Sequence, residues 1–188
     1  MKKYLLFSTI ALVAFLGACA HDHSDGEAAF DCKQTNFTFN GTSQSVTCPD
    51  LPTQVKIKVE SLVVPNGQTF TFKPFSSADD NGYEIVFTHN SISARIFGRT
   101  ATTVSTGIDF TSAKNACIEI HDITKEKHVQ VYYNTETCSG TAVVDYDDDA
   151  ATAPTSRAAR YTGSGGTIAL NELHFQKDAT AHVHSLAE

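Results

Sequence analysis

The sequence predicts an all-β fold in which two antiparallel sheets pack as a sandwich. Short runs of alternating apolar and polar residues recur from residue 31 onward, about ten residues apart, which is typical of sandwiches and barrels. Clusters of Gly, Pro, Asn and Asp separate these runs, as turns require. No long window keeps a helical period. The 188 residues, 41% of them hydrophobic, suit one domain with a real core.

The expected strands lie, in chain order, at residues 55–60, 69–73, 85–87, 92–96, 118–121, 129–133 and 168–175. In the first, apolar residues alternate with charged ones, which predicts one buried and one solvated face. The Asp79-Asp80-Asn81-Gly82 turn precedes the third strand, and a polar turn near Thr124 joins the fifth to the sixth. Residues 147–166 combine an acidic run with Ala, Thr, Pro, Ser and Gly. They are expected to form one long loop, a common place for binding functions.

The charge balance excludes two classes of partner. The chain has 14 Lys and Arg residues against 21 Asp and Glu residues, a formal charge of −7. Binding to nucleic acid needs clustered Lys and Arg to neutralise phosphates, so a nucleic-acid partner is not expected. Attraction to anionic lipid headgroups is not expected for the same reason.

The N-terminus carries an export signal. Met1-Lys2-Lys3 is basic, residues 4–16 are largely apolar, and the run ends in Leu16-Gly17-Ala18-Cys19. This arrangement resembles the lipobox of bacterial lipoproteins. The resemblance implies that residues 1–18 are a signal peptide and that Cys19 carries diacyl and N-acyl (palmitate-type) chains. An ordinary secretory signal that happens to contain a Cys is the alternative.

The lipoprotein resemblance also implies an address. Ala20 in place of Asp after the lipidated Cys implies transport to the outer membrane, on its periplasmic or surface side. Two or three acyl chains would anchor the protein stably without embedding it. Residues 19–30 are then the lipidated Cys and a flexible tether of small and polar residues.

The remaining cysteines are expected to form disulfides. An even number of cysteines remains, and export would place them in an oxidising compartment; they are Cys32, Cys48, Cys117 and Cys138. Nearness in the sequence favours the pairings Cys32–Cys48 and Cys117–Cys138. A hairpin near Thr124 would place Cys117 opposite about Tyr132, so the chain beyond that strand must curl back to close the second bridge. A tetrathiolate metal site is the alternative, but no Cys-x-x-Cys spacing supports it.

The order of several segments resembles the concanavalin A-like and laminin-G-like jelly rolls. These segments are residues 82–88, 92–98, 116–120, 127–134 and 166–175. The resemblance implies a jelly-roll sandwich over residues 31–178 whose last strand returns to pair with the first, followed by a flexible tail at 179–188. An immunoglobulin-like sandwich is the alternative.

No catalytic motif is recognisable, so the chain is not expected to be an enzyme. Jelly-roll glycosidases carry paired carboxylates on one strand, whereas the spacing of Glu119 and Asp122 places them on opposite faces. Gly163-Ser164-Gly165 lies in an expected loop and does not form a nucleophile elbow.

The acidic run is a candidate calcium site. Its carboxylates belong to Asp145, Asp147, Asp148 and Asp149. Calcium takes six to eight oxygen ligands, and jelly rolls of the resembled kind often hold it at the rim. The spacing does not match an EF-hand, and a solvated acidic loop is the alternative. Asp79 and Asp80 are a second candidate, which turn chemistry also explains.

Two His-x-His pairs are weaker Zn²⁺ or Cu²⁺ candidates, formed by His21, His23, His182 and His184. Both pairs lie in segments expected to be mobile, where they are also explained as polar filler. His121, His128 and His174 lie on or beside expected strands and are interpreted as surface or hydrogen-bonded residues.

The predicted function is a lipid-anchored binding module of the cell envelope, lectin-like or adhesive. It would recognise a glycan or a protein through loops 76–82 and 145–166, with calcium as a candidate cofactor. Tyr132, Tyr146 and Tyr161 are weak candidates for stacking on a sugar, and the absence of Trp argues against a strong platform. The alternatives are a periplasmic metal-handling lipoprotein that uses the His pairs and an accessory subunit of an envelope complex.

Overall fold

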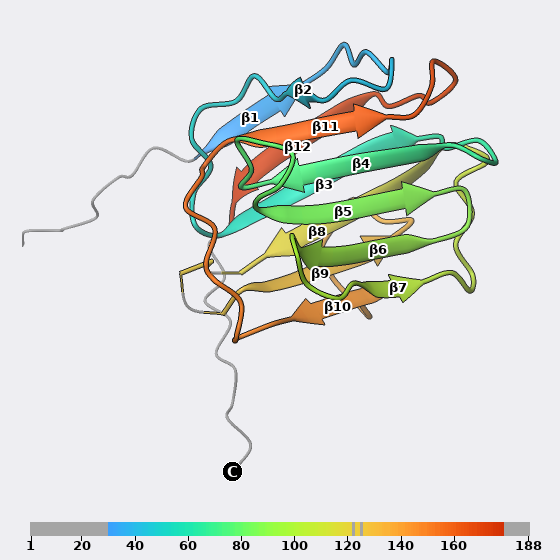
Figure 1. Ribbon diagram of the computed structural model, residues 1–188. Helices are drawn as coiled ribbons and strands as arrows, with labels where there is room; N and C mark the ends of the chain where they lie inside the picture. The colour runs from blue at the N-terminus through green and yellow to red at the C-terminus, as the bar shows by residue number, and fades with distance from the viewer. Residues whose placement is uncertain (1–29, 122, 125, 179–188) are drawn as a thin grey trace, which may run out of the picture.

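The computed structural model describes residues 30–121, 123–124 and 126–178 (Figure 1). Cys19 with the segment that resembles a lipobox and the pairs His21/His23 and His182/His184 lie outside these residues, so their roles stay predictions. Among the described residues, no helix has the length and hydropathy needed to cross a membrane.

The described chain forms two six-stranded antiparallel sheets. The back sheet has the order β1 (Asp31–Gln34), β12 (Glu172–Lys177), β3 (Val55–Leu62), β8 (Lys114–Ile120), β9 (His128–Tyr133) and β10 (Val144–Asp147). The front sheet has the order β2 (Gln44–Ser45), β11 (Ala159–Gly163), β4 (Thr69–Pro74), β5 (Tyr83–Thr88), β6 (Ile92–Ile96) and β7 (Thr102–Val104). The sheets lie face to face, and the last strand, β12, pairs with β1 and β3 (Figure 1). The two-sheet jelly roll predicted from the sequence is confirmed.

The core lies between the sheets and is built by the predicted alternation. On β3, Val55, Ile57 and Val59 are fully buried, while the charged residues between them face outward. Aromatic rings from both sheets meet in the middle: the rings of Phe72 and Phe175 lie 6.0 Å apart, centroid to centroid. Strands such as β3 and β5 bury one face only, so their outer faces remain available for polar chemistry, whereas β8 and β9 bury residues on both faces.

Both disulfides form as predicted, Cys32–Cys48 and Cys117–Cys138. Cys117 pairs with Tyr132 in the β8–β9 ladder, the position expected from a turn near residue 124. Beyond β9 the chain turns back so that the Cα atoms of Cys117 and Cys138 lie 5.1 Å apart.

The prediction that residues 147–166 form one loop is wrong, because β11 lies inside this segment. Its inward residues are Ala159, Tyr161 and Gly163, and two of these are too small to mark an apolar alternation in the sequence. Gly163 is required there, since a Cβ would lie 2.3 Å from a ring carbon of Phe39. At Gly163 the small inward residue therefore reflects close packing of the Phe39 ring and does not indicate a loop.

The last expected strand begins later than predicted. Leu170 and Ile168 are buried, but β12 starts at Glu172, and Ala169 makes only an isolated bridge with Val63.

The described chain begins and finishes at one end of the sandwich, which we call the terminal end. The amide N of Lys177 donates to the carbonyl of Phe30 at 3.2 Å. Lys177 pairs with Val55, and Val55 pairs in turn with Ile120. The β8–β9 turn therefore lies at this end, as does the loop between β4 and β5 (Figure 1).

Candidate functional site

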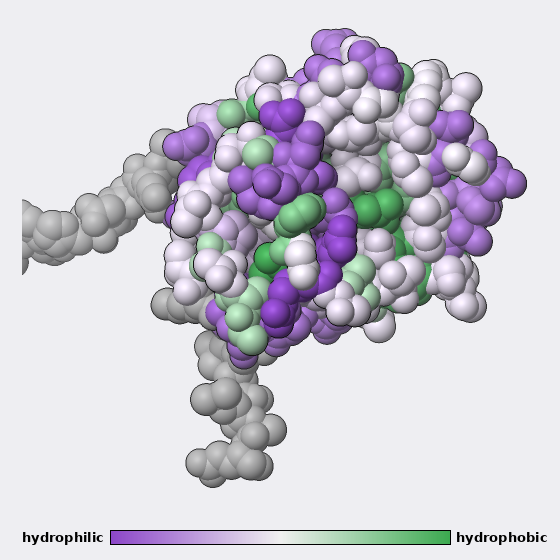
Figure 2. Space-filling model, viewed as in Figure 1, coloured by the Kyte–Doolittle hydropathy of each residue, from purple (hydrophilic) through white to green (hydrophobic). Residues whose placement is uncertain are grey.

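A row of charged side chains crosses the outer face of the front sheet. Strand register places Arg160 of β11 opposite Lys73 of β4, and Glu84 of β5 opposite Arg95 of β6. Phe72 pairs with Ile85 in the β4–β5 ladder, so the next residues on the two strands, Lys73 and Glu84, lie beside each other. We call Arg160, Lys73, Glu84 and Arg95 the charged row. In Figure 2, which views this face, a band of hydrophilic side chains runs across the strands.

The carboxylate of Glu84 holds the row together. Arg95 donates to Oε1 of Glu84 from both Nε and Nη2, at 2.9 and 2.6 Å. Nζ of Lys73 lies 3.6 Å from the other carboxylate oxygen. The Glu84 side chain is 16% exposed and that of Lys73 11%, so these groups are fixed by packing as well as by charge. Charge-assisted contacts of this kind are stronger than neutral hydrogen bonds.

The loop between β4 and β5 borders the row. Nζ of Lys73 donates to the carbonyl of Asp79 at 2.7 Å, and Nε of Arg160 lies 3.7 Å from the Asp79 carboxylate. Nε of Arg160 also donates to Oγ of Ser43 at 2.9 Å. A shallow pocket of about 220 Å³ results, lined by Gly41, Ser43, Thr71, Lys73, Asp79, Glu84 and Thr162. Loop 76–82, predicted to be a recognition loop, therefore contributes Asp79 to this pocket.

An exposed aromatic ring stands at the end of the row. Phe97 is the large hydrophobic side chain most open to solvent within the described residues, at 40% exposed. The guanidinium carbon of Arg95 lies 5.8 Å from the centre of its ring. Sequence reasoning missed this residue, although Ser93, Arg95 and Phe97 share the outward phase of the alternation around β6.

A second hollow of about 510 Å³ lies where β6 and β7 meet the end of β10. Its lining is formed by Gly98, Arg99, Thr100, Ala101, Thr102, Tyr146, Asp147 and Asp148. Arg99 binds both carboxylate oxygens of Asp148, at 2.6 and 3.0 Å. The hydrogen bond from Arg99 lowers the pKa of Asp148, and the same contact raises the pKa of Arg99.

The carboxylates of the acidic run point in different directions. Asp145 lies on the back sheet with Oδ1 2.5 Å from Nε2 of His128, whereas Asp148 pairs with Arg99. Asp147 and Asp149 are exposed. The calcium site at these residues stays a prediction, and an ion that took both Asp145 and Asp148 would have to replace two existing contacts.

The three tyrosines proposed for stacking are buried, with exposed fractions of 7% for Tyr132, 4% for Tyr146 and 5% for Tyr161. The ring of Tyr161 packs against the rings of Phe37 and Phe39. The hydroxyl of Tyr146 donates to Asp148, and that of Tyr132 donates to Gln130. Little ring area is left for a ligand, so Phe97 is the better platform.

Comparisons of the sequence find no matching family model and no matching curated protein. Comparison of the structure finds jelly rolls. Sheep galectin-11 in complex with glycerol aligns with a TM-score of 0.51 and 9% identity, covering 74% of this chain and 99% of that one. Galectin LEC-6 of Caenorhabditis elegans aligns with a TM-score of 0.51 and 7% identity, covering 76% of this chain and 94% of that one.

A fructofuranosidase from Schwanniomyces occidentalis, complexed with fructose, aligns with a TM-score of 0.52 and 7% identity. The match covers 78% of this chain and 33% of the enzyme. At such low identity these likenesses establish the galectin-like, concanavalin A-like jelly-roll fold and carry no residue of a site across.

Proposed function

We propose that this protein is a lectin-like, non-catalytic module that binds a glycan on the outer face of the front sheet. The observation that carries the proposal is the charged row, which is half-buried, held in place by ion pairs and ends at the exposed ring of Phe97.

This surface has the chemistry that a sugar requires. Sugar hydroxyls both donate and accept hydrogen bonds, and the row offers a carboxylate acceptor in Glu84 between cationic donors. Because the ion pairs already fix these side chains, binding would lose little side-chain entropy. The C–H face of a sugar ring is apolar and can pack on an aromatic ring such as that of Phe97.

The structural neighbours support this choice of ligand class. Two of them are galectins, one of which is in complex with glycerol, and the fructofuranosidase is in complex with fructose. Glycerol and fructose each carry several hydroxyl groups. We also propose that a lipid on Cys19 holds the module at a bacterial envelope, which the resemblance of residues 16–19 to a lipobox supports.

A glycan array probed with the full chain, purified in detergent, tests the binding. Arg95→Met is expected to weaken binding at least tenfold, since a charge-assisted hydrogen bond contributes about 1.5–3 kcal/mol. Phe97→Ala is expected to weaken binding as well, because it removes the ring on which a sugar would pack. Lys33→Met is the matched control, because Lys33 forms a comparable ion pair with Glu172 at 3.0 Å on the other sheet. Binding that survives Arg95→Met, or an array without any bound glycan, would overturn the proposal and point to a protein ligand.

The same array, run in EDTA and again with added Ca²⁺, tests the calcium prediction. Calcium-dependent binding that is lost with Asp147→Ala and Asp148→Ala would support it, and indifference to both treatments would remove calcium from the function.

Mass spectrometry of the protein purified from bacterial membranes tests the lipid anchor. A lipidated Cys19 at the N-terminus is expected, and a chain cleaved without lipid would contradict the anchor.

A further inference from the structure

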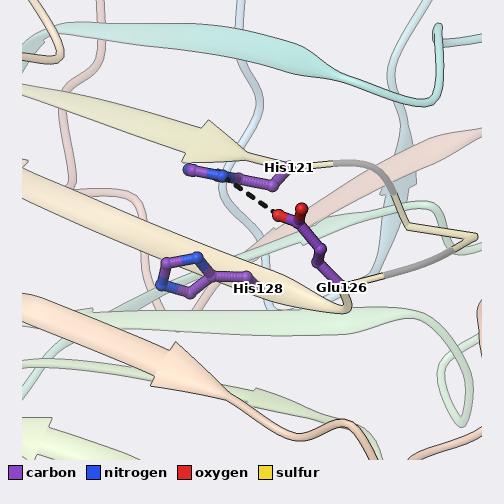
Figure 3. A group of neighbouring side chains, drawn as sticks. All are labelled: His121, Glu126 and His128. Atoms are coloured by element: carbon purple, nitrogen blue, oxygen red, sulfur yellow. Dashed lines mark ion pairs between the residues drawn. The ribbon is translucent and has the colours of Figure 1, made fainter. Parts of the chain in front are cut away.

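A second polar cluster lies on the outer face of the back sheet, at the terminal end. It is formed by His121, Glu126 and His128 around the β8–β9 turn (Figure 3). It is separate from the charged row, which occupies the other sheet.

Strand register brings the two histidines together. The β8–β9 ladder ends with Ile120 opposite Val129, and the next step is a hydrogen bond of 3.1 Å from the amide of His121 to the carbonyl of His128. Because Ile120 and Val129 point into the core, both imidazoles point outward. Their ring centroids lie 4.5 Å apart, and the residues are only 2% and 4% exposed.

The turn supplies a carboxylate to the same place. Oε2 of Glu126 lies 3.5 Å from Nδ1 of His121 (Figure 3). One ligand atom from each of the three residues lies within 4.8 Å of the others. Ligands of a tetrahedral zinc ion, bound at about 2 Å, lie roughly 3.3 Å apart, so a small side-chain adjustment closes the group around an ion.

We propose that His121, Glu126 and His128 form a binding site for a divalent transition-metal ion of the zinc class. Two imidazoles and one carboxylate suit Zn²⁺ or Cu²⁺, whereas Ca²⁺ prefers oxygen ligands only. Three protein ligands leave a fourth position for water. The ion would join the two strands to the turn between them and so fix the hairpin at the terminal end.

Asp145 is placed to orient one of the ligands. Its carboxylate lies 2.5 Å from Nε2 of His128 and 3.3 Å from the side-chain amide N of Gln130. A carboxylate that accepts from one imidazole nitrogen fixes the tautomer in which the other nitrogen carries the lone pair that a metal needs. The Asp145 contact thus directs Nδ1 of His128 toward the ion.

A second group on the same sheet is less suitable. Glu60, Glu172 and His174 also bring three ligand atoms within 4.8 Å. However, Glu172 already pairs with the ammonium group of Lys33 at 3.0 Å, and this group offers only one imidazole. A cation there would compete with a fixed positive charge, so His174 serves as the control position.

The test is isothermal titration of Zn²⁺ into the full, chelator-stripped chain in detergent. The background chain carries His21→Gln, His23→Gln, His182→Gln and His184→Gln, so that the terminal His pairs contribute nothing. We expect one Zn²⁺ per chain, with affinity reduced at least tenfold by His128→Ala or Glu126→Gln and unchanged by His174→Ala. Asp145→Asn should weaken binding by about tenfold or more while leaving the stoichiometry intact.

Electron paramagnetic resonance of the Cu²⁺-loaded protein provides a second readout. Splitting from two imidazole nitrogens is expected in the background chain and from one in His121→Ala. Glu126→Gln keeps the proposal testable if a His variant does not fold, because Glu126 lies in the turn and its side chain is 33% exposed. No saturable Zn²⁺ binding in the background chain, or a Zn²⁺ affinity in Glu126→Gln and His128→Ala that is unchanged from the background chain, would overturn the site. Neither outcome bears on the glycan-binding face.

Discussion

At the scale of single residues, Gly82 determines where the β4–β5 loop lies. Its φ is +75°, and a Cβ there would lie 2.4 Å from the carbonyl oxygen of Phe75. The backbone of the loop therefore closes on itself in a way that only glycine permits. This closure holds Asp79 within reach of Lys73 and Arg160, so Gly82 shapes the pocket without lining it.

Gly82→Ala is expected to destabilise the fold by about 2–4 kcal/mol, because left-handed strain and a backbone overlap act together. Gly67 is a matched control: its φ is +76°, but a Cβ would meet nothing within 4 Å. Gly67→Ala should therefore lose only about 1 kcal/mol. Urea unfolding of the two variants checks this, and equal losses would show that the Phe75 carbonyl yields easily.

At the scale of elements, the neighbouring strands β8 and β9 bury polar groups on their outer face. Glu119 is 1% exposed, its carboxylate lies 3.3 Å from Nζ of Lys56, and it accepts from the hydroxyl of Tyr132 at 3.3 Å. Burial, followed by the negative charge of Glu119, raises the pKa of Tyr132 to about 12. The folded state thus keeps the phenol neutral where an unfolded chain ionises it.

The sign of the pH effect follows from this shift in the pKa of Tyr132. An unfolded tyrosine ionises near pH 10, so between about pH 10 and 12 the folded state holds more protons and stability falls as pH rises. The contribution is complete below pH 10 and lost through the folded pKa. Urea unfolding at a series of pH values should show a shallower fall in Tyr132→Phe than in the unaltered chain. Identical slopes would mean that Tyr132 ionises equally in both states.

Strands with strong alternation, such as β3 and β4, were predictable because their inward residues are large and their outward residues polar. β11 was not predictable, since Ala159 and Gly163 hide its alternation.

The histidines of the proposed metal site illustrate a signal in the sequence that was not used. A register that places Cys117 opposite Tyr132 also places His121 opposite His128, by counting along both strands. A turn shifted by one residue would reverse the faces, so this inference depends on the turn.

Contacts between the two sheets could not be predicted by counting residues along strands. Arg99 reaches Asp148 because β10 of the back sheet closes against β6 and β7 of the front sheet. That approach depends on how the two sheets pack and twist, which residue periodicity along one strand does not contain. For the same reason the charged row emerged only when the order of β11, β4, β5 and β6 was known.

At the scale of the whole molecule, the sandwich is closed differently at its two edges (Figure 1). At one edge Cys32 of β1, in the back sheet, is bonded to Cys48, which follows β2 of the front sheet. At the other edge β10 meets β6 and β7, and Arg99 pairs with Asp148. The first closure is covalent, while the second depends on packing and on an exposed ion pair that salt would screen.

The covalent edge leads to a prediction about global stability. The Cys32–Cys48 bridge has a sequence separation of 16, and on the chain-entropy model a loop of that size contributes about 3 kcal/mol. Replacing both cysteines with Ala should lower the Tm by about 6–12 °C. Cys117 and Cys138 are separated by 21 residues, so their replacement should lower the Tm by a similar amount.

Hydrogen exchange distinguishes the two bridges, because only Cys32–Cys48 connects the sheets. Its loss should raise exchange along β1 and β2, at the open edge, whereas loss of Cys117–Cys138 should raise it in the chain between β9 and β10. If both variants exchange alike throughout, the bridges act only on the unfolded chain. In that case the packing of β1 and β2 alone, without its covalent link, closes that edge of the sandwich.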